Sequence, residues 1–441
     1  MLTIIKYNKK ANENILKLRK KYLKIAFDLN ITHFYQSKHK IRLGIYYYSI
    51  KNGGIERLTT LFLKYLNKIN IFNLYLFTQI RNQNEYKIPE NINRRIIKYG
   101  LLKNLIKESK KNRVDILVYQ FYNHDEIKYL NKITIFKTIF YNHSCFLYWI
   151  YIDFFSYFST LYNDYRNSKY VVSLIPFEND YLFKKWKINS ILMNNFITYE
   201  YNKIIPSNLS SKTILMIGRG SDKMKRFELG IKAMKYIIKE ISETEMKIIS
   251  DLNNIDSLLN LVNILKIKNL IKFVGYTTNP EIYFKNASLH IFPTISESFG
   301  LALCETKIYG IPNILVGIDY ITIIKGGNII IYDDRPQSIA KEAIKILKND
   351  VYRKKLGIEA RKSMIKFKNE KILKKWIELI FSIYKGYNYY IELRNQDKTL
   401  SKKDSLYIIK NQVKLLRIRK PSFQNITVND LENFSFMIKL K

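Results

Sequence analysis

The sequence predicts an α/β protein built from two successive units of parallel sheet and helix. Three observations predict it. Short apolar runs alternate with helical patterns in both halves of the chain, glycine turns follow several of these runs, and one polar stretch separates the two series. A length of 441 residues is also too great for a single hydrophobic core. Ligands of such folds bind at the carboxyl ends of the strands, so we expect a binding cleft between the two units.

The first unit is predicted at residues 41–198, after a basic N-terminal extension at residues 1–40 that carries one helical pattern at residues 12–26. A strand-like run at residues 42–50 leads through Gly53 and Gly54 into a helical pattern at residues 55–66. Strand, glycine turn and helix in this order are typical of a parallel sheet. The other strand-like runs of this unit lie at residues 73–78, 114–120, 134–141, 170–175 and 190–194.

A polar stretch at residues 199–212, which contains Pro206, is predicted to be the linker to a second unit at residues 213–369. A closing helix is predicted at residues 370–386, and residues 387–441 form a C-terminal extension rich in Lys, Asn and Leu. The expected strands of the second unit are residues 213–218, 246–250, 271–275, 289–293, 313–316 and 328–332. Its expected helices are residues 227–240, 255–265, 301–309, 337–347 and 351–367.

The net charge is strongly positive, since 75 Lys and Arg residues outnumber 37 Asp and Glu residues and give +38. An apolar fraction of 47% excludes a disordered chain. Two cysteines, Cys145 and Cys304, are too few for a disulfide framework and suit a reducing compartment. Lysine as early as Lys6 argues against a secretory signal, and no apolar run reaches about 18 residues. We therefore expect a cytoplasmic protein whose cations favour peripheral contact with an anionic membrane.

The most informative segment is residues 291–312, where an apolar run ends at Pro293 and a helical pattern follows. Gly300 opens that helix, so the first N–H groups of the helix are unpaired and form a site for an anion such as phosphate. Glu297 and Glu305 stand eight positions apart, or roughly 12 Å along a helix. Because a carboxylate can bind a vicinal diol, the segment fits a polyol, a diphosphate and a second polyol in a row, which describes a sugar nucleotide.

Two further segments combine a strand, a glycine turn and a helix. Residues 214–233 contain the pair Gly218-Arg219, followed by Lys223 and Lys225 just before the helix. The turn after the first strand contains Gly53 and Gly54 within the run Gly-Gly-Ile-Glu-Arg that ends at residue 57. Arginine offers phosphate a planar fork and lysine a point charge, while glycine lets the backbone approach a ligand closely.

Together these segments resemble the signature of the retaining GT-B glycosyltransferases of the "group 1", or glycosyltransferase family 4-like, family. The resemblance covers roughly residues 41–386 and implies two Rossmann-like domains that face each other across a cleft. It implies that Glu297 holds hydroxyls of the donor sugar and that Glu305 holds the ribose. The other donor-binding residues that it implies are Gly53, Gly54, Gly218, Ser298, Phe299, Gly300, Leu301 and Tyr276. Tyr276 follows a predicted strand in a loop similar to the one that borders the nucleobase.

The resemblance implies that Arg219 and a lysine clamp the donor diphosphate. The commonest spacing of the family would place this lysine where Met224 stands. We choose Lys225, because Lys-Arg-Phe leading into a helix matches the family, and Lys223 is the alternative.

A catalytic role is also implied for His143, which follows a predicted strand. Family members often carry a histidine at that place, near the donor sugar and the acceptor. His124 stands at a similar strand end and is the alternative. A satisfied polar residue at a strand end is the structural interpretation of either.

The implied function is metal-independent, retaining transfer of a hexosyl group from a nucleotide-diphosphate sugar to a glycan, a lipid-linked acceptor or a protein. The nucleotide sugar is then a co-substrate, and no cofactor and no metal are expected. The absence of an Asp-x-Asp pair agrees with this, because the other large glycosyltransferase fold uses that pair to hold a metal.

Three alternatives remain: a sugar-nucleotide epimerase of the same fold, a non-catalytic protein, and a basic protein that binds nucleic acid or another polyanion. The spacing of the two glutamates argues against the epimerase. No helix-turn-helix, zinc-finger or RNA-recognition signature is present, so no nucleic acid is expected as a partner. Residues 145–165 are dense in aromatic side chains, which fits either a packed helix or a surface facing the acceptor or a membrane.

Overall fold

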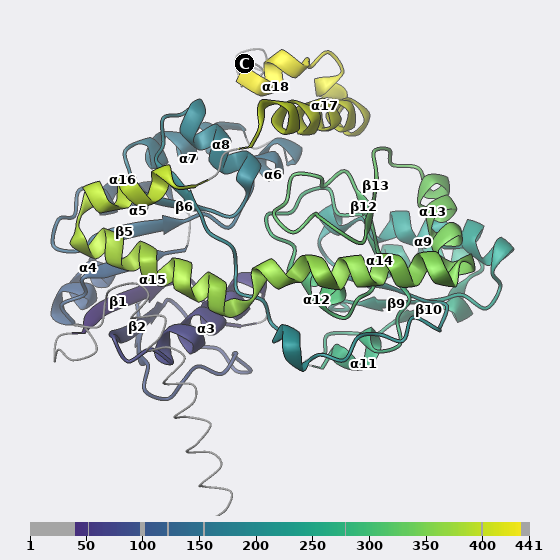
Figure 1. The fold of residues 1–441 in the computed structure, drawn as a ribbon, viewed down its shortest axis with the longest axis horizontal. Coiled ribbons are helices and arrows are strands. Elements are labelled where there is room, and N and C mark those ends of the chain that lie inside the picture. Colours follow the sequence, from purple (N-terminus) through teal and green to yellow (C-terminus); the bar gives the residue numbers. More distant parts are fainter. Residues whose placement is uncertain are drawn as a thin grey trace, which may run out of the picture.

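The computed structural model describes residues 40–51, 53–97, 102–120, 123–152, 155–277, 279–397 and 400–433. Within these residues the chain forms two parallel sheets with helices on their faces, one sheet in each half of the molecule (Figure 1). The α/β class and the two-domain arrangement predicted from the sequence are thus confirmed. The helical pattern at residues 12–26 lies outside the described residues.

The N-terminal sheet has seven strands in the order β3-β2-β1-β4-β5-β6-β7, and neighbouring strands run parallel. Its strands are β1 (Ile41–Tyr46), β2 (Phe72–Thr78), β3 (Asn93–Ile96), β4 (Ile116–Tyr119), β5 (Lys137–Tyr141), β6 (Tyr170–Ser173) and β7 (Ser190–Leu192). Its helices are α3 (Gly54–Asn67), α4 (Leu102–Lys111), α5 (His124–Leu130), α6 (Phe146–Tyr151), α7 (Phe155–Arg166) and α8 (Pro176–Lys184). The strand order reverses at β1 and β4, where ligands of such sheets bind.

The largest differences between this sheet and the sequence predictions concern strand β3 and the end of β1. The edge strand β3 was not predicted, because its residues Asn-Arg-Arg-Ile are mostly exposed and form no apolar run. The first strand ends at Tyr46 instead of residue 50, since the backbone leaves the sheet after Tyr47 N–H donates to the Phe77 carbonyl over 3.1 Å. Sequence predictions of strands rely on the pattern of apolar residues. This pattern is missing in β3, and it does not mark the end of β1.

The C-terminal sheet has six parallel strands in the order β10-β9-β8-β11-β12-β13. Its strands are β8 (Thr213–Ile217), β9 (Glu245–Ile249), β10 (Ile271–Phe273), β11 (Leu289–Phe292), β12 (Asn313–Val316) and β13 (Asn328–Ile331). Its helices are α9 (Phe227–Glu240), α10 (Asp256–Ile264), α11 (Glu281–Phe284), α12 (Leu301–Ile308), α13 (Pro336–Lys348) and α14 (Asp350–Ser363). All six strands predicted for this half are present, and their ends agree within two residues.

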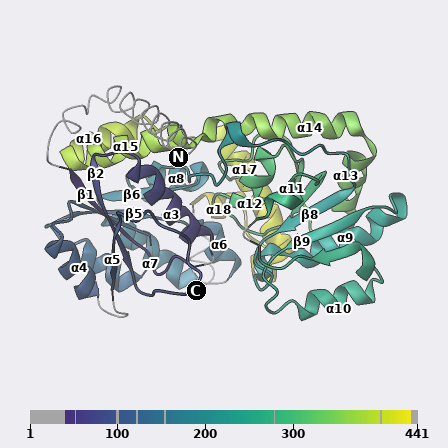
Figure 2. The same cartoon turned by 90° about the horizontal axis from the view of Figure 1, so that it is seen from below.

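After α14 the chain returns to the N-terminal domain. Helix α15 (Asn369–Lys385) continues the line of α14 across both domains (Figure 1), and its Trp376 ring lies 4.4 Å from the Phe62 ring of α3. Helices α4, α5 and α7 cover one face of the N-terminal sheet, while α15 and α16 (Tyr387–Asn395) lie toward the other face (Figure 2). The predicted closing helix therefore completes the core of the N-terminal domain.

The described part of the C-terminal extension is largely helical. Besides α16, it forms α17 (Lys402–Arg419) and the short helix α18 (Val428–Asn433). Its described residues include buried apolar side chains such as Leu415, Leu416 and Leu431. The largest buried cluster runs from the N-terminal sheet to residues of α12 in the C-terminal domain, so the two domains are packed against each other. The described part of the chain contains no helix with the length and apolar character needed to cross a membrane.

Candidate active site

Two loops of the C-terminal domain meet beyond neighbouring strands. Strands β8 and β11 pair in parallel, so their carboxyl ends lie at the same edge of the sheet. The loop after β8 holds Arg219 and Lys225, and the loop after β11 holds Glu297. The two loops are joined directly, because Ile295 N–H donates to the Met224 carbonyl over 2.8 Å and the Thr294 hydroxyl donates to the same oxygen over 3.1 Å.

Lys225 and Glu297 form a salt bridge at this junction, between Nζ and Oε1. Both side chains are largely buried, with 19% and 17% of their surface exposed. Gly218 makes room for the lysine, because a Cβ at residue 218 would lie 3.1 Å from Lys225 Cγ. Lys223 is exposed instead, so of the two candidate lysines the structure places Lys225 against the glutamate.

Helix α12 begins directly beside this salt bridge. Gly300 is its N-cap, with φ +79° and ψ 68°, a left-handed conformation that favours glycine. The preceding loop carries half-buried Ser298 and buried Phe299, whose ring lies 5.9 Å from that of Phe367. The Glu297 N–H donates to the Tyr320 hydroxyl over 3.3 Å, which fixes the backbone of the glutamate.

The glycine turn of the N-terminal domain faces the start of α12. A Cβ at Gly54, the first residue of α3, would lie 3.6 Å from Leu301 Cδ1. One turn farther along each helix, Arg57 of α3 and Glu305 of α12 form a salt bridge of 2.8 Å. The Thr198 hydroxyl donates to the same Glu305 oxygen over 3.0 Å. The three motifs singled out in the sequence therefore meet at one place between the domains.

Arg219 lies at the rim of this site. Its side chain is 72% exposed and its guanidinium lies 3.5 Å from Asp222. Its charge also acts across the domain boundary, where burial raises the pKa of the Glu56 carboxyl and Arg219 pulls it back down. Such an exposed arginine can reach a phosphate in the site without first breaking a buried contact.

Tyr276 is about half exposed, in the loop after β10. It interacts with Tyr86 of the N-terminal domain. Burial raises the pKa of Tyr86, and its hydrogen bond with Tyr276 raises this pKa further. The loop that resembles a nucleobase border thus lies against the opposite domain.

His143 follows β5 at the carboxyl edge of the N-terminal sheet. Its Nε2 lies 3.0 Å from the Gln120 side-chain oxygen, and its buried Nδ1 has no hydrogen-bond partner. Burial lowers the pKa of His143 to about 3, so the ring is neutral at physiological pH. His124, the alternative, lies 2.8 Å from Asp164 of α7, so its ring is bound within the N-terminal domain.

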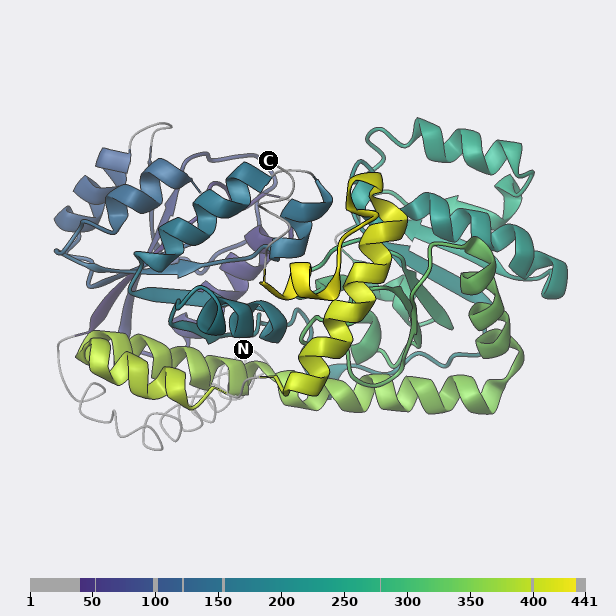
Figure 3. The same cartoon turned by 90° about the horizontal axis from the view of Figure 1, so that it is seen from above.

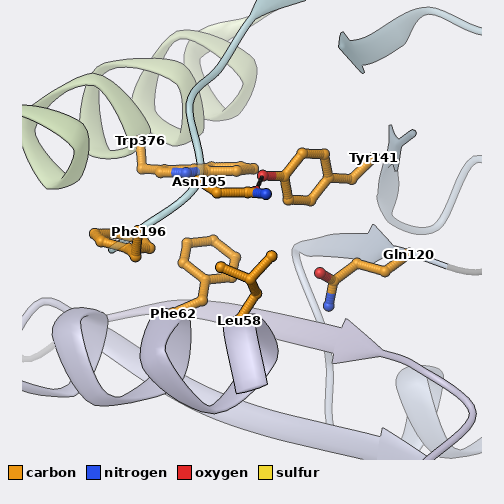
Figure 4. Close-up of a pocket in the computed structure, with 7 residues that line it drawn as sticks. All are labelled: Leu58, Phe62, Gln120, Tyr141, Asn195, Phe196 and Trp376. Carbon is orange, nitrogen blue, oxygen red and sulfur yellow. Dashed lines mark hydrogen bonds between the residues drawn. The ribbon is translucent and has the colours of Figure 1, made fainter. Parts of the chain in front are cut away.

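Gln120 connects His143 to a small cavity inside the N-terminal domain (Figure 4). The cavity is lined by Leu58, Phe62, Gln120, Tyr141, Asn195, Phe196 and Trp376. Most of these side chains are apolar, and the polar Tyr141 hydroxyl and Asn195 side chain bond to each other. The cavity is thus a packing space behind His143, and the site itself lies between the domains.

Helix α6, at the start of the aromatic segment, is packed rather than presented to solvent. The Phe146 ring lies 5.6 Å from Phe177 and 5.4 Å from Tyr181, and Ile150 is fully buried. Of the two sequence interpretations, the described side chains of α6 fit the packed helix.

Sequence reasoning missed three residues of this site. Arg57 ends the glycine-turn motif of the N-terminal domain, but the sequence predicted no role for it, because its partner Glu305 is distant in sequence. Thr198 lies in a segment without a motif, at the domain boundary. Tyr320 lies in an apolar loop after β12, and only the folded chain brings its hydroxyl to Glu297.

Among solved structures, sucrose-phosphate synthase from Thermosynechococcus elongatus has a TM-score of 0.66 at 14% identity, over 78% of this chain and 100% of that one. Anabaena HepE in complex with UDP and glucose has a TM-score of 0.63 at 12% identity, with the same coverage. The two facing parallel sheets therefore form the GT-B fold.

Residues 199–363 match the family model Glycosyl transferases group 1. This part of the chain belongs to that glycosyltransferase family, as the sequence motifs predicted. The matched range contains Arg219, Lys225, Glu297 and Glu305, which form the C-terminal side of the site.

Two curated relatives are similar over about half of this chain. An uncharacterized glycosyltransferase of Haemophilus influenzae is 22% identical over 47% of this chain and 59% of its own length. The poly(glycerol-phosphate) alpha-glucosyltransferase of Bacillus subtilis is 24% identical over 48% of this chain and 30% of its own length. The chain thus matches only part of these relatives.

Proposed function

We propose that the protein is a retaining glycosyltransferase that moves a sugar from a nucleotide-diphosphate sugar to a glycan, lipid-linked or protein acceptor without a metal. The observation that carries the proposal is the buried Lys225–Glu297 salt bridge beside the start of α12. A lysine, a carboxylate and a helix N-terminus in contact are the groups that a sugar diphosphate needs. HepE, which shares the fold, has been solved with UDP and glucose, and this supports a uridine nucleotide as the first donor to test.

Donor binding would change the partners of two charged pairs, Lys225–Glu297 and Arg219–Asp222. The diphosphate would draw Lys225 away from Glu297, and exposed Arg219 would close on the phosphate from the rim. Glu297 would then accept hydrogen bonds from hydroxyls of the donor sugar. Glu305 would accept hydrogen bonds from the ribose hydroxyls, while Arg57 keeps the Glu305 carboxylate oriented.

The transfer itself would proceed on one face of the sugar. The bond between the anomeric carbon and the β-phosphate oxygen breaks, and its electrons leave with the diphosphate. The acceptor oxygen bonds to the anomeric carbon from the same face, and its proton passes to the departing phosphate oxygen. Lys225, Arg219 and the N–H groups of α12 stabilise the charge that grows on the leaving group, as preorganised donors do in other enzymes.

His143 would contribute through hydrogen bonding rather than as an acid. Its ring is neutral near pH 7, and Nδ1 is the ring atom without a partner. We propose that Nδ1 of His143 forms a hydrogen bond with a hydroxyl of the donor sugar or the acceptor. Peripheral contact between the basic surface and an anionic membrane also remains a proposal, which binding to anionic vesicles at rising salt concentration would test.

The function is tested by incubating the protein with UDP-, GDP- and ADP-sugars without an acceptor and following hydrolysis by NMR. We expect slow hydrolysis of at least one donor with retained anomeric configuration, and its loss in Glu297→Gln. Binding of none of these nucleotides would contradict the proposal. Isomerisation of the sugar instead of hydrolysis would favour the epimerase.

A further inference from the structure

Helix α17 of the C-terminal extension packs on the C-terminal domain next to the domain boundary. Figure 3 shows it in yellow over that boundary, with α18 directed toward the N-terminal domain. Two groups of polar contacts join α17 to the loops that hold the Lys225–Glu297 salt bridge. One group leads to the loop of Lys225, and the other leads to Glu297.

The first group runs from Arg419 at the end of α17 to the loop of Lys225. The Arg419 guanidinium binds Asp334 with both arms, over 2.9 and 3.0 Å. Asp334 also forms a salt bridge of 2.7 Å with Arg226, the neighbour of Lys225. Arg226 in turn donates from Nε to the Pro293 carbonyl over 2.8 Å, at the start of the Glu297 loop. All three charged side chains are largely buried, with exposed fractions of 5% for Arg419, 22% for Asp334 and 9% for Arg226.

The backbone of Arg226 explains why this support is needed. Its φ of +48° lies in the left-handed region, which non-glycine residues hold only when their surroundings fix them. The salt bridge with Asp334 and the bond to Pro293 provide that restraint. Arg419 supports this restraint because its two hydrogen bonds to Asp334 fix the orientation of the carboxylate that binds Arg226.

The second group runs from the middle of α17 to the loop after β12. Gln412 donates to the Gly317 carbonyl over 2.7 Å and to Asp319 over 3.0 Å, and Asn411 donates to Asp319 over 2.9 Å. The next residue in that loop is Tyr320, whose hydroxyl accepts the N–H of Glu297. Packing is tight here, since a Cβ at Gly317 would lie 2.2 Å from Leu415 Cδ1.

We propose that α17 holds the donor site from behind and that Arg419 is a positioning residue, acting through Asp334 and Arg226 on Lys225. The inference rests on the proposed function for the role of Lys225, while the support of the loop itself stands on the contacts alone. The extension also contacts the N-terminal domain, because Arg419 donates to the Tyr151 hydroxyl over 3.3 Å and Tyr181 donates to the Leu431 carbonyl over 2.9 Å. The extension thus contacts both domains and the loops of the donor site.

The test compares Arg419→Met with Arg417→Met in the full chain. Arg417 lies on the same helix but binds only the Ile426 carbonyl in the contacts of the described residues, over 2.7 and 2.9 Å. Hydrogen exchange of the peptides covering residues 219–226 and 293–300 is measured first, and UDP binding and hydrolysis of UDP-glucose second. We expect Arg419→Met to speed exchange in both loops and to weaken UDP binding about tenfold, the ratio that corresponds to about 1.4 kcal/mol.

Arg417→Met should leave exchange and binding as in the wild type. Equal exchange in the two variants would overturn the inference. If wild-type protein binds no sugar nucleotide, the proposed function fails, and the exchange measurement still decides whether Arg419 holds the loop. If Arg419→Met does not fold, Arg419→Lys, which keeps the charge but loses the two-armed contact, carries the same measurement with a smaller expected change.

Discussion

Arg57 and Glu305 connect the two domains through a salt bridge of 2.8 Å, and each belongs to a motif of its own domain. Glu305 is almost fully buried, with 7% of its side chain exposed, while Arg57 is 28% exposed. Because the ribose of a donor is proposed to bind Glu305, one carboxylate serves both the domain contact and the ligand. Donor binding and the relative position of the domains should therefore depend on each other.

Arg57→Met should lower the free energy of unfolding, because the nearly buried Glu305 side chain then loses its guanidinium partner. We expect a loss of about 1–3 kcal/mol, the range for leaving a buried polar group unpaired. Urea unfolding followed by circular dichroism measures it. Lys203→Met is the control, since the Lys203–Glu200 pair is largely exposed on both sides and such pairs contribute about 0–1 kcal/mol. Equal losses in the two variants would contradict a special role for the contact between the domains.

Lys225→Met should reduce catalysis far more than Lys223→Met does. Lys225 lies against Glu297, whereas Lys223 is exposed on the same short turn. Removing one preorganised group that stabilises a leaving charge costs about 100- to 1,000-fold in kcat. We expect that loss for Lys225→Met in donor hydrolysis and less than about threefold for Lys223→Met. The reverse order would show that the lysine alternatives had been assigned wrongly.

Glu178→Gln should flatten the dependence of stability on pH. Glu178 is fully buried in α8, where burial raises the pKa of its carboxyl to about 8 from an ordinary 4.5. Its Oε1 accepts bonds from the Phe146 N–H and the Tyr162 hydroxyl. Between these two values the folded state keeps a proton that the unfolded state has released. The contribution is therefore complete below pH 4.5 and is lost as the pH rises through 8.

Urea unfolding of wild type and Glu178→Gln at pH 5, 6.5 and 8 checks this. The wild type should lose stability more steeply with rising pH, by at most about 1.4 kcal/mol per pH unit. Glu240→Gln is the control. That carboxyl is exposed, and its pKa is lowered by a hydrogen bond with Lys348, so its replacement acts in the opposite direction. Parallel curves for wild type and Glu178→Gln would mean that Glu178 is ionised in the folded protein near pH 7.

Alanine should have opposite effects at two glycines of the site. Gly300 has φ +79°, so Gly300→Ala should cost about 1–2 kcal/mol, although a Cβ there has room at 3.6 Å from Ile321 Cδ1. Gly54 begins α3, and a Cβ there meets Leu301 at an ordinary 3.6 Å. Gly54→Ala should therefore be neutral or stabilise by up to about 1 kcal/mol. Thermal unfolding of both variants measures the difference, and a stable Gly300→Ala protein would refute the conformational argument.

Much of the fold could be predicted because buried parallel strands form apolar runs that stand out from helices and turns. Strand β12 and helix α9 have the predicted ends; β12 lies between Pro312 and Gly317, and α9 begins after the basic turn that ends at Arg226. Strand β3 could not be found, because its side chains are exposed and polar. Helices α16 and α17 of the extension begin at the caps Gly386 and Ser401, but the distant parts of the chain on which they pack cannot be inferred from these local signals.

The site was predictable where one segment carries the chemistry. Gly300, Glu297 and Glu305 lie in a single run, with Glu297 in the loop before α12 and Glu305 within the helix, so the sequence already relates them. The pairs Arg57–Glu305 and Arg419–Asp334 join residues that are far apart in sequence, so no local sequence pattern predicts them. Which of the two lysines meets Glu297 was likewise decided by the turn that the loop makes, and the structure favours Lys225.

The side chains that complete both domains come late in the chain. Trp376 packs on Phe62 of the N-terminal domain, and Arg419 binds Asp334 behind the donor loops. During synthesis, each sheet therefore emerges from the ribosome before the residue that closes its core or supports its loops. We expect a nascent chain that has not reached residue 419 to be both a client for chaperones and unable to consume nucleotide sugar.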